Sequence, residues 1–274
     1  MMHAARYRSR LMTRAVPFSY STIILRVEGR EQVERAVVAR VGSDWRIVPG
    51  TERTIEVDTV LVGYGLESSS ELARLIGCKL WFDRQRGGWL PVRDDALRTS
   101  KLGVFAAGDG SGIGGAKHAE IEGRLAGVAA AAELGALGEK EAHTHLAGAR
   151  RRLSRMDRFL TTMNRLYLVG PGLFELATPE TVICRCEERS LADLEALVAE
   201  GISDPNIVRA LSRIGMGRCQ GRNCASTVAA ILARRTGCAV DHIAPLSVRP
   251  PVKPVPISAI AQQRNQDRSE TLVS

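Results

Sequence analysis

Four of the six cysteines in this chain form two tight pairs, and these pairs restrict the fold more than any other feature of the sequence. One residue separates Cys184 from Cys186, four residues separate Cys219 from Cys224, and 32 residues lie between the pairs. The intervening residues predict two capped helices, which can fold one pair back onto the other. Four thiolates that converge from two sides suit an iron–sulfur cluster or a zinc site.

Disulfide bonds and reduced core cysteines are the alternatives to a metal site. Disulfides require an oxidising compartment, and no apolar segment typical of a signal peptide follows the basic N-terminus. We therefore expect a cytoplasmic protein that reaches the inner face of the membrane only through partners. Zinc prefers C-x2-C pairs, so C-x-C and C-x4-C favour a cluster. Cys78 and Cys238 lie outside the pattern and are expected to be buried, inert thiols.

The net charge of +8 comes largely from two arginine-rich stretches, residues 147–168 and 201–235. Such stretches are one signature of nucleic-acid binding. The second stretch, however, surrounds the cysteines, and Arg185, Arg218 and Arg222 lie within two residues of candidate ligands. An iron–sulfur core with four thiolates is an anion, so these cations should stabilise it and raise its potential. We expect no nucleic-acid partner, although two short helices at 191–213 leave a helix-turn-helix as a third interpretation.

The cysteine region resembles a known class of iron–sulfur modules. The segments VICRCEE and GMGRCQGRNC are similar to the module related to bacterioferritin-associated ferredoxin, over roughly residues 179–240. This resemblance implies a small all-α domain in which Cys184, Cys186, Cys219 and Cys224 are the ligands of one [2Fe–2S] cluster.

A glycine-rich loop at 108–115 follows an expected buried strand at 103–107 and precedes an alanine-rich helix. The loop satisfies G-x-G-x-x-G, but no acidic residue ends a second strand about 20 residues later, so we reject an NAD site here. The longer run TSKLGVFAAGD at 99–109 resembles the second flavin-binding motif of glutathione-reductase-like flavoproteins.

The flavin motif implies an FAD site at the end of the expected strand. Small residues allow the backbone to approach the cofactor, and Asp109 can accept a hydrogen bond from a ribityl hydroxyl. The N-terminus of the following helix offers N–H groups to the flavin or its pyrophosphate. His118 is a weaker candidate for facing the flavin, and no catalytic residue is identified. The cofactor-binding residues that the resemblance implies are Gly108, Asp109, Gly110, Gly112, Gly115 and Ala116.

The run GDGSGIGGAKHAEIEGRLAG at 108–127 is very like the α subunits of two-component, dye-linked dehydrogenases. That family, which includes opine oxidases, proline dehydrogenase and hydrogen cyanide synthase, appends the same iron–sulfur module. The resemblance implies that a catalytic flavoprotein subunit oxidises an amine, amino acid or opine and that electrons pass through this chain. The N-terminal, FAD-binding half of that family is not recognisable in this sequence. We therefore expect either that the chain is a fragment or that a separate polypeptide supplies that half. The alternative is a non-enzymatic [2Fe–2S] carrier or sensor with a vestigial flavin site.

These features predict an α/β part of an FAD/NAD(P)-binding, pyridine nucleotide-disulfide oxidoreductase-like region, followed by a small all-α domain. Residues 22–66 should form an antiparallel meander that ends in a buried strand at 57–62, and residues 77–92 a hairpin. No run of 18 apolar residues exists, so we expect no transmembrane helix. The expected regions are a flexible or non-native N-terminus at 1–21, the oxidoreductase region at 22–145, a basic helical connector at 146–178, the [2Fe–2S] domain at 179–245, and a proline-rich, then disordered tail at 246–274.

Overall fold

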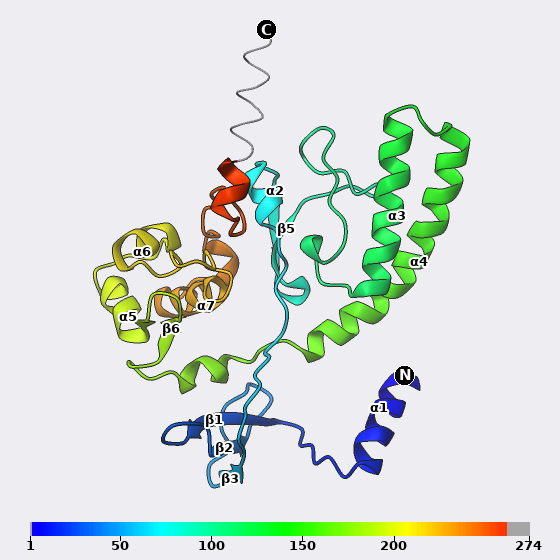
Figure 1. The fold of residues 1–274 in the computed structure, drawn as a ribbon. Helices are drawn as coiled ribbons and strands as arrows, with labels where there is room; N and C mark the ends of the chain where they lie inside the picture. Colours follow the sequence, from blue (N-terminus) through cyan, green and yellow to red (C-terminus); the bar gives the residue numbers. More distant parts are fainter. Residues whose placement is uncertain (1, 262–274) are drawn as a thin grey trace. The chain divides into compact units, whose positions relative to one another are not determined.

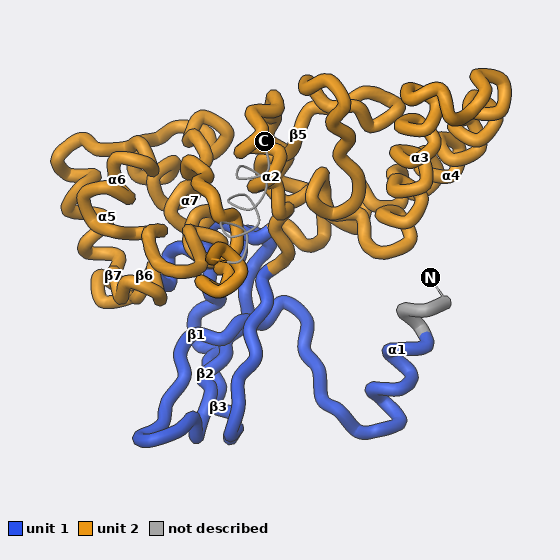
Figure 2. Tube along the Cα trace, turned by 45° about the horizontal axis from the view of Figure 1, so that its top comes forward, with its two compact units in different colours: residues 1–64, 169–177 blue, residues 65–168, 178–274 orange. Residues whose placement is uncertain are grey.

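The computed structural model describes residues 2–261, and the chain divides into two compact units (Figure 2). The first unit comprises residues 1–64 and 169–177, and the second comprises residues 65–168 and 178–274. Both the glycine-rich loop and the four paired cysteines therefore belong to the second unit. The end of the tail, residues 262–274, lies outside the described residues.

The first unit is built on a three-stranded antiparallel meander of the kind that the sequence predicts. Its strands are β1 (Thr22–Glu28), β2 (Arg35–Arg40) and β3 (Arg53–Glu56), in that order across the sheet. Four successive residues of the central strand, 36–39, are buried. A helix, α1 (Met2–Thr13), precedes the sheet within the segment that we expected to be flexible.

The buried strand predicted at 57–62 is wrong. These residues form no regular element, and the side chain of Leu61 is 91% exposed. An apolar run is buried only where a neighbouring strand or helix covers it, and no strand of the described residues pairs with this one. The strand expected at 103–107 is likewise reduced to an isolated bridge between Arg98 and Phe105.

The second unit begins with a one-turn helix and the predicted hairpin. Helix α2 (Glu71–Leu75) precedes β4 (Leu80–Asp83), which pairs antiparallel with β5 (Gly88–Pro91). A short 3-10 helix, η1 (Arg84–Arg86), closes the hairpin, and the Asp83 carboxylate accepts hydrogen bonds from two of its N–H groups. A second one, η2 (Asp109–Ser111), forms the start of the glycine-rich loop.

Two long helices follow the loop and pack side by side (Figure 1). Helix α3 (Ala116–Glu133) confirms the predicted alanine-rich helix, and α4 (Glu139–Leu166) includes the basic stretch. Leu125 and Leu153 meet across the pair and bury the side chain of Leu97. No helix in the described part of the chain is both long and apolar enough to span a membrane.

The cysteine region contains helices, but it is not all-α. A two-stranded hairpin, β6 (Val182–Cys184) and β7 (Arg189–Ser190), precedes the helices α5 (Leu191–Ala199), α6 (Pro205–Ser212) and α7 (Ala225–Thr236). The predicted helix starts are confirmed: Ser190 and Asp193 form a capping box, and Asp204 caps α6 ahead of Pro205. The prediction of an all-α domain is wrong because the residues on either side of the turn at 185–188 pair as two short strands.

Candidate functional site

The glycine-rich loop is held in shape by the carboxylate of Asp109. Its Oδ1 atom accepts hydrogen bonds from the N–H groups of Gly114 and Gly115, both at 3.0 Å. Gly115 is the N-cap of α3 and adopts a φ of 79°, which favours glycine. No side chain caps the helix, and its first turn carries no acidic residue. The helix N-terminus, beginning at Ala116, is thus left open to an electron-rich ligand.

A buried glutamate, Glu122, holds the first residue of the loop in place. The Glu122 carboxylate on α3 accepts a hydrogen bond of 2.7 Å from the N–H of Gly108. It also forms a two-point ion pair with Arg93, at 2.5 and 3.0 Å, and the Arg93 guanidinium donates to the Ala106 carbonyl. The Glu122 side chain is only 3% exposed. These contacts fix the backbone just before Asp109, where the expected strand is missing.

Two further glycines of the loop, Gly110 and Gly112, pack closely against neighbouring residues. A Cβ at Gly110 would lie 3.2 Å from the Ser69 carbonyl, and one at Gly112 would lie 2.8 Å from the Arg86 guanidinium. The six residues of the flavin motif therefore lie together at one loop and helix start. Whether they hold FAD remains a prediction.

His118 is buried beneath the loop and does not present a surface to a ligand. Its Nε2 atom lies 3.0 Å from the Asp157 carboxylate on α4, and its Nδ1 atom has no hydrogen-bond partner among the described residues. A Cβ at Gly114 would meet the imidazole at 2.6 Å. The His118 side chain thus ties α3 to α4, which corrects the suggestion that it faces a flavin.

The four paired cysteines come together at one end of the second unit. Cys184 and Cys186 lie on and just after β6, while Cys219 and Cys224 lie in the loop before α7. The side chains of Cys184 and Cys224 lie close together, as do those of Cys186 and Cys219, and all three other thiols act on the pKa of Cys224. All six cysteines are free. The two sequence pairs therefore approach each other as predicted, and each close contact is between one cysteine of the first pair and one of the second.

The surroundings of the thiols differ in polarity. Burial, together with the neighbouring thiols of Cys184, Cys219 and Cys186, raises the pKa of the Cys224 thiol to about 12. Burial also acts to raise the pKa of Cys219, but hydrogen bonds from the N–H groups of Asn223, Gly221 and Arg222 and from Cys186 lower it overall. Backbone N–H groups close to a sulfur favour its thiolate form.

A glycine allows close packing of the loop at 213–224, which we call the cysteine loop. A Cβ at Gly217 would lie 2.2 Å from the Cys186 Cβ, so only glycine allows the loop to approach the C-x-C turn. The N–H of Gly215 lies 3.5 Å from the Cys184 sulfur. The loop at 213–224 therefore wraps the thiols with backbone rather than with side chains.

The four thiols are also the candidate ligands of a metal cluster. In the described part of the chain, no group of three or more His, Cys, Asp or Glu side chains could hold a metal ion. That Cys184, Cys186, Cys219 and Cys224 hold one cluster therefore stays a prediction. The donor set itself, four cysteine sulfurs in two pairs with N–H groups beside one of them, has the chemistry that a two-iron cluster requires.

The arginines near the cysteines are largely used within the protein. Arg213 forms an ion pair of 2.7 Å with Glu187, and Arg222 forms one of 2.9 Å with Glu71. Arg209 is buried and donates to the Ser247 carbonyl and to Gln220. Arg222 thus lies beside the thiols, as the sequence predicts, but the Glu71 carboxylate balances its charge.

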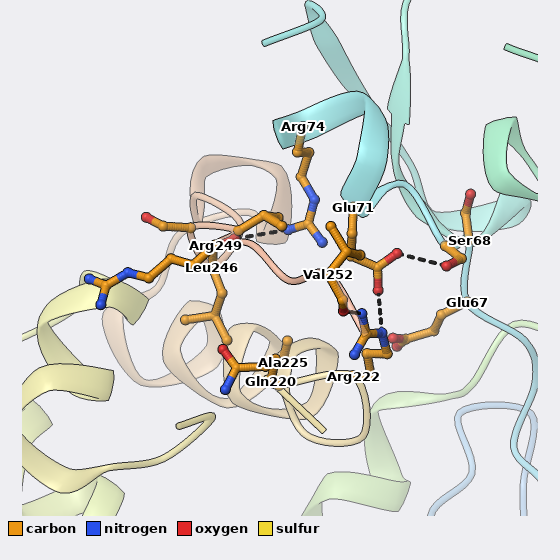
Figure 3. Close-up of a pocket in the computed structure, with 14 residues that line it drawn as sticks. Glu67, Ser68, Glu71, Arg74, Gln220, Arg222, Ala225, Leu246, Arg249 and Val252 are labelled. Carbon is orange, nitrogen blue, oxygen red and sulfur yellow. Dashed lines mark hydrogen bonds and ion pairs between the residues drawn. The ribbon is translucent and has the colours of Figure 1, made fainter. Parts of the chain in front are cut away.

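The cysteine loop also borders a small cavity in the second unit (Figure 3). Its volume is about 160 Å³, and residues from three segments line it: 67–74, 220–225 and 246–252. Arg74 donates to the Leu246 carbonyl, and Arg222 donates to the Val252 carbonyl. The proline-rich segment after Leu246 is thus bound to the cysteine loop and to α2.

Sequence reasoning missed Glu122, Arg93 and the segment that contains Glu71. Glu122 lies inside the run that resembles dehydrogenase subunits, but an acidic residue in a helix usually belongs to a solvated face. Glu71 follows three serines and is recognisable from sequence only as part of a short helix. No local pattern marks either carboxylate, since each is distinguished by a partner far away in sequence.

Known families match two parts of the chain. Residues 1–135 match the pyridine nucleotide-disulphide oxidoreductase family, and residues 179–264 match the sarcosine oxidase A3 domain. The second match covers the cysteine region and does not test the resemblance to bacterioferritin-associated ferredoxin, which remains a prediction.

Individual relatives extend the likeness over most of the chain. One subunit of the opine oxidase of Agrobacterium tumefaciens is 36% identical over 248 residues, covering 87% of this chain and 49% of the relative. The HcnB subunit of the hydrogen cyanide synthase of Pseudomonas protegens is 30% identical over 251 residues, covering 91% and 52%. The chain spans about half the length of these curated relatives.

A solved structure shares the fold. The crystal structure of L-proline dehydrogenase from P. horikoshii matches with a TM-score of 0.67 and 24% identity, covering 93% of this chain and 47% of that one. The likeness establishes the fold of the chain.

Proposed function

We propose that this chain is an electron-transfer subunit of a flavin- and [2Fe–2S]-dependent dehydrogenase. The chain is homologous to subunits of opine oxidase and hydrogen cyanide synthase, and it matches the pyridine nucleotide-disulphide oxidoreductase family and the sarcosine oxidase A3 domain. The observation that carries the proposal is the pair of sites in one compact unit, a flavin-type loop and four gathered free thiols.

The FAD part of the proposal rests on the loop at 108–115. Asp109 shapes the loop through Oδ1, while its Oδ2 accepts no hydrogen bond from a described residue, which leaves it for a ribityl hydroxyl. The uncapped start of α3 would face the electron-rich part of the cofactor. In the described residues no parallel strand–helix–strand unit cradles a pyrophosphate. Another polypeptide segment, on this protein or on a partner, has to supply it.

The iron–sulfur part rests on Cys184, Cys186, Cys219 and Cys224. Each iron of a [2Fe–2S] cluster takes two thiolates, and these four neighbouring cysteines offer two for each iron. The cluster supplies one-electron transfer when bound. The protein's own part is to lower the pKa of a ligand thiol, exclude water from Cys184 and Cys224, and hold both sites at a fixed separation.

The substrate class follows from the relatives. We infer that an amine, amino acid or opine is oxidised at a flavin on a catalytic partner protein, because the opine oxidase and hydrogen cyanide synthase relatives are themselves subunits of larger enzymes. Electrons then leave that partner through this chain to an acceptor. The six free thiols agree with a reducing compartment, so we place the assembly in the cytoplasm.

A spectrum of the protein made with ample iron tests the proposal. We expect [2Fe–2S] absorption bands and about two irons per chain in the wild type. Cys219→Ser should abolish both, whereas Cys238→Ser, which alters a thiol outside the two pairs, should retain them. Because a ligand variant can misfold, Gly217→Ala serves as a second variant that keeps all four thiols but drives a Cβ into Cys186. A colourless wild-type protein that binds one zinc ion contradicts the proposal.

Flavin content separates the enzyme subunit from a simple carrier. Co-purification with the catalytic partner and with a candidate FAD-binding segment should yield bound FAD, and Asp109→Ala should reduce it. Iron without flavin in every combination would instead indicate a [2Fe–2S] carrier or sensor.

A further inference from the structure

The flavin-type loop and the cysteine loop are joined by one short piece of chain, residues 67–71, which we call the bridge segment. It precedes and begins α2 and belongs to the same compact unit as both loops. Its residues contact the glycine-rich loop at one end and the cysteine loop at the other. Residues 67–71 themselves belong to neither the flavin motif nor the cysteine motif.

Ser68 makes the contact with the glycine-rich loop. Its hydroxyl donates a hydrogen bond of 2.8 Å to the carbonyl of Asp109, and its N–H donates to the Gly87 carbonyl at 2.9 Å. The neighbouring Ser69 carbonyl lies close enough to Gly110 that a Cβ there would come within 3.2 Å. The bridge segment therefore packs directly on the backbone that carries the flavin motif.

Glu71 makes the contact with the cysteine loop. Its Oε1 atom lies 2.9 Å from Arg222 Nε, and its Oε2 atom accepts a hydrogen bond of 2.7 Å from the Ser69 hydroxyl (Figure 3). The Glu71 side chain is 13% exposed. A charge pair this well covered is screened little by salt. Both carboxylate oxygens of Glu71 are thereby held, one by Arg222 of the cysteine loop and one by Ser69 within the bridge segment.

Arg222 carries the contact to the cysteine itself. Its Nη1 atom donates to the Cys219 carbonyl at 3.1 Å, and its backbone N–H donates to the same carbonyl at 3.2 Å. There is a second contact: Glu67 lies beside Ser226, which is in the first turn of α7, two residues after Cys224. Burial raises the pKa of Glu67, and the Ser226 hydroxyl acts in the opposite direction. Both halves of the C-x4-C pair are thus tied to the bridge segment.

We propose that Glu71 is a positioning residue that sets the separation of the flavin loop from the cysteine loop and balances the charge of Arg222 beside Cys219. This inference rests on the function proposed above. Ser68 and Glu71 are three residues apart, so their backbones span at most about 11 Å. Electron tunnelling slows exponentially with distance, and a short rigid connection between two redox groups therefore protects the rate of transfer.

The test uses the full chain, loaded with iron and assembled with its flavin-bearing partner. Glu71→Gln keeps the shape of the side chain but leaves Arg222 as an unpaired cation. We expect the midpoint potential of the cluster to rise and the rate of electron transfer from flavin to cluster, followed by stopped-flow, to fall about tenfold. Ser68→Ala should slow transfer without moving the potential, because it alters only the flavin end.

A measurement without cofactors accompanies the kinetics. In the iron-free chain, Glu71→Gln should increase hydrogen exchange of the amides at 108–115 as well as those at 219–224. The matched control is Glu195→Gln, which removes a carboxylate paired with Arg235 on α7, away from the bridge segment. The control should leave the potential, the transfer rate and the exchange at 108–115 unchanged. Glu71→Arg combined with Arg222→Glu should recover the transfer rate lost in either single variant.

The outcomes separate this inference from the function on which it rests. Wild-type protein without iron or flavin defeats the proposed function. Intact iron and flavin in Glu71→Gln, with unchanged potential and transfer rate, overturn the role of Glu71 and leave the proposed function standing. If Glu71→Gln loses its iron, Ser68→Ala decides: a wild-type transfer rate in that variant overturns the inference, and a slower rate supports it.

Discussion

At the residue scale, Glu122 shows how a single buried carboxylate can organise a loop. It accepts from the Gly108 N–H and pairs with Arg93, which in turn holds the Ala106 carbonyl. A charge buried to this extent is costly unless it is paired and hydrogen-bonded. The pair therefore contributes specificity to the backbone at 106–108, and removing one member leaves the other charge unsatisfied.

Glu122→Ala is expected to lower the free energy of unfolding by about 3 kcal/mol, because it strands the Arg93 guanidinium. Urea denaturation followed by circular dichroism measures the change. Glu120→Ala on the same helix is the control: Glu120 pairs with Arg124 at 2.7 Å, but both side chains are well exposed. That pair should be worth about 0.5 kcal/mol. Equal losses in the two variants would contradict the structural role of Glu122.

At the element scale, the start of α5 is specified by two side chains. The Ser190 hydroxyl accepts from the Asp193 N–H, and the Asp193 carboxylate accepts from the Ser190 N–H. Both bonds satisfy N–H groups that a helix start leaves free. The hydrogen bond from the Ser190 N–H is the main reason that the pKa of Asp193 lies below its ordinary value.

Ser190→Ala should cost about 1 kcal/mol of stability at pH 7. Asp193→Asn should also destabilise the protein at pH 7, but by an amount that depends on pH. Because the folded pKa is lowered, the stabilisation is complete above the unfolded value of about 3.9 and is lost as the pH falls through the folded pKa. Thermal midpoints of wild type and Asp193→Asn should therefore converge on acidification.

Glu200→Gln provides the control at the opposite end of α5. A negative charge is unfavourable at a helix C-terminus, so this variant should leave the stability unchanged or raise it slightly. A loss comparable to that of Asp193→Asn would show that any missing carboxylate in this region destabilises the protein.

At the scale of the whole molecule, the four thiols come from two segments of the chain that only the tertiary fold unites. A group that binds all four would connect the β6–β7 turn with the loop before α7. Ligands that bind only the folded state stabilise it, and structural metal sites couple binding to folding.

Removal of iron from the loaded protein should therefore lower the thermal midpoint by roughly 5–10 °C. Calorimetry of the iron-loaded and iron-free protein, both kept reduced, measures the difference. Cys219→Ser should show the lower midpoint with or without iron in the medium, while Cys238→Ser should respond like the wild type. Identical midpoints for the loaded and iron-free wild type would mean that the metal does not bridge the two segments.

The prediction of elements from sequence succeeded where the signal is local. The hairpin at 80–91, the helix from Ala116, the capping box at Ser190 and the start of α6 at Asp204 were all recognisable, because turn residues and caps act on neighbours in the chain. The strands expected at 57–62 and 103–107 failed for the opposite reason. An apolar run becomes a strand only when another segment pairs with it.

The sequence by itself determined which chemical groups this protein can offer: the cysteine spacing, the glycine-rich loop ahead of a helix, and the helix caps are properties of short stretches. Only the tertiary structure decided how those groups are used. It brought the two cysteine pairs close together, paired Arg222 with Glu71 and Arg93 with Glu122, and placed the bridge segment between both loops. The physical reason is that the energy of a buried charge depends on its partner, and each partner here lies at least 29 residues away.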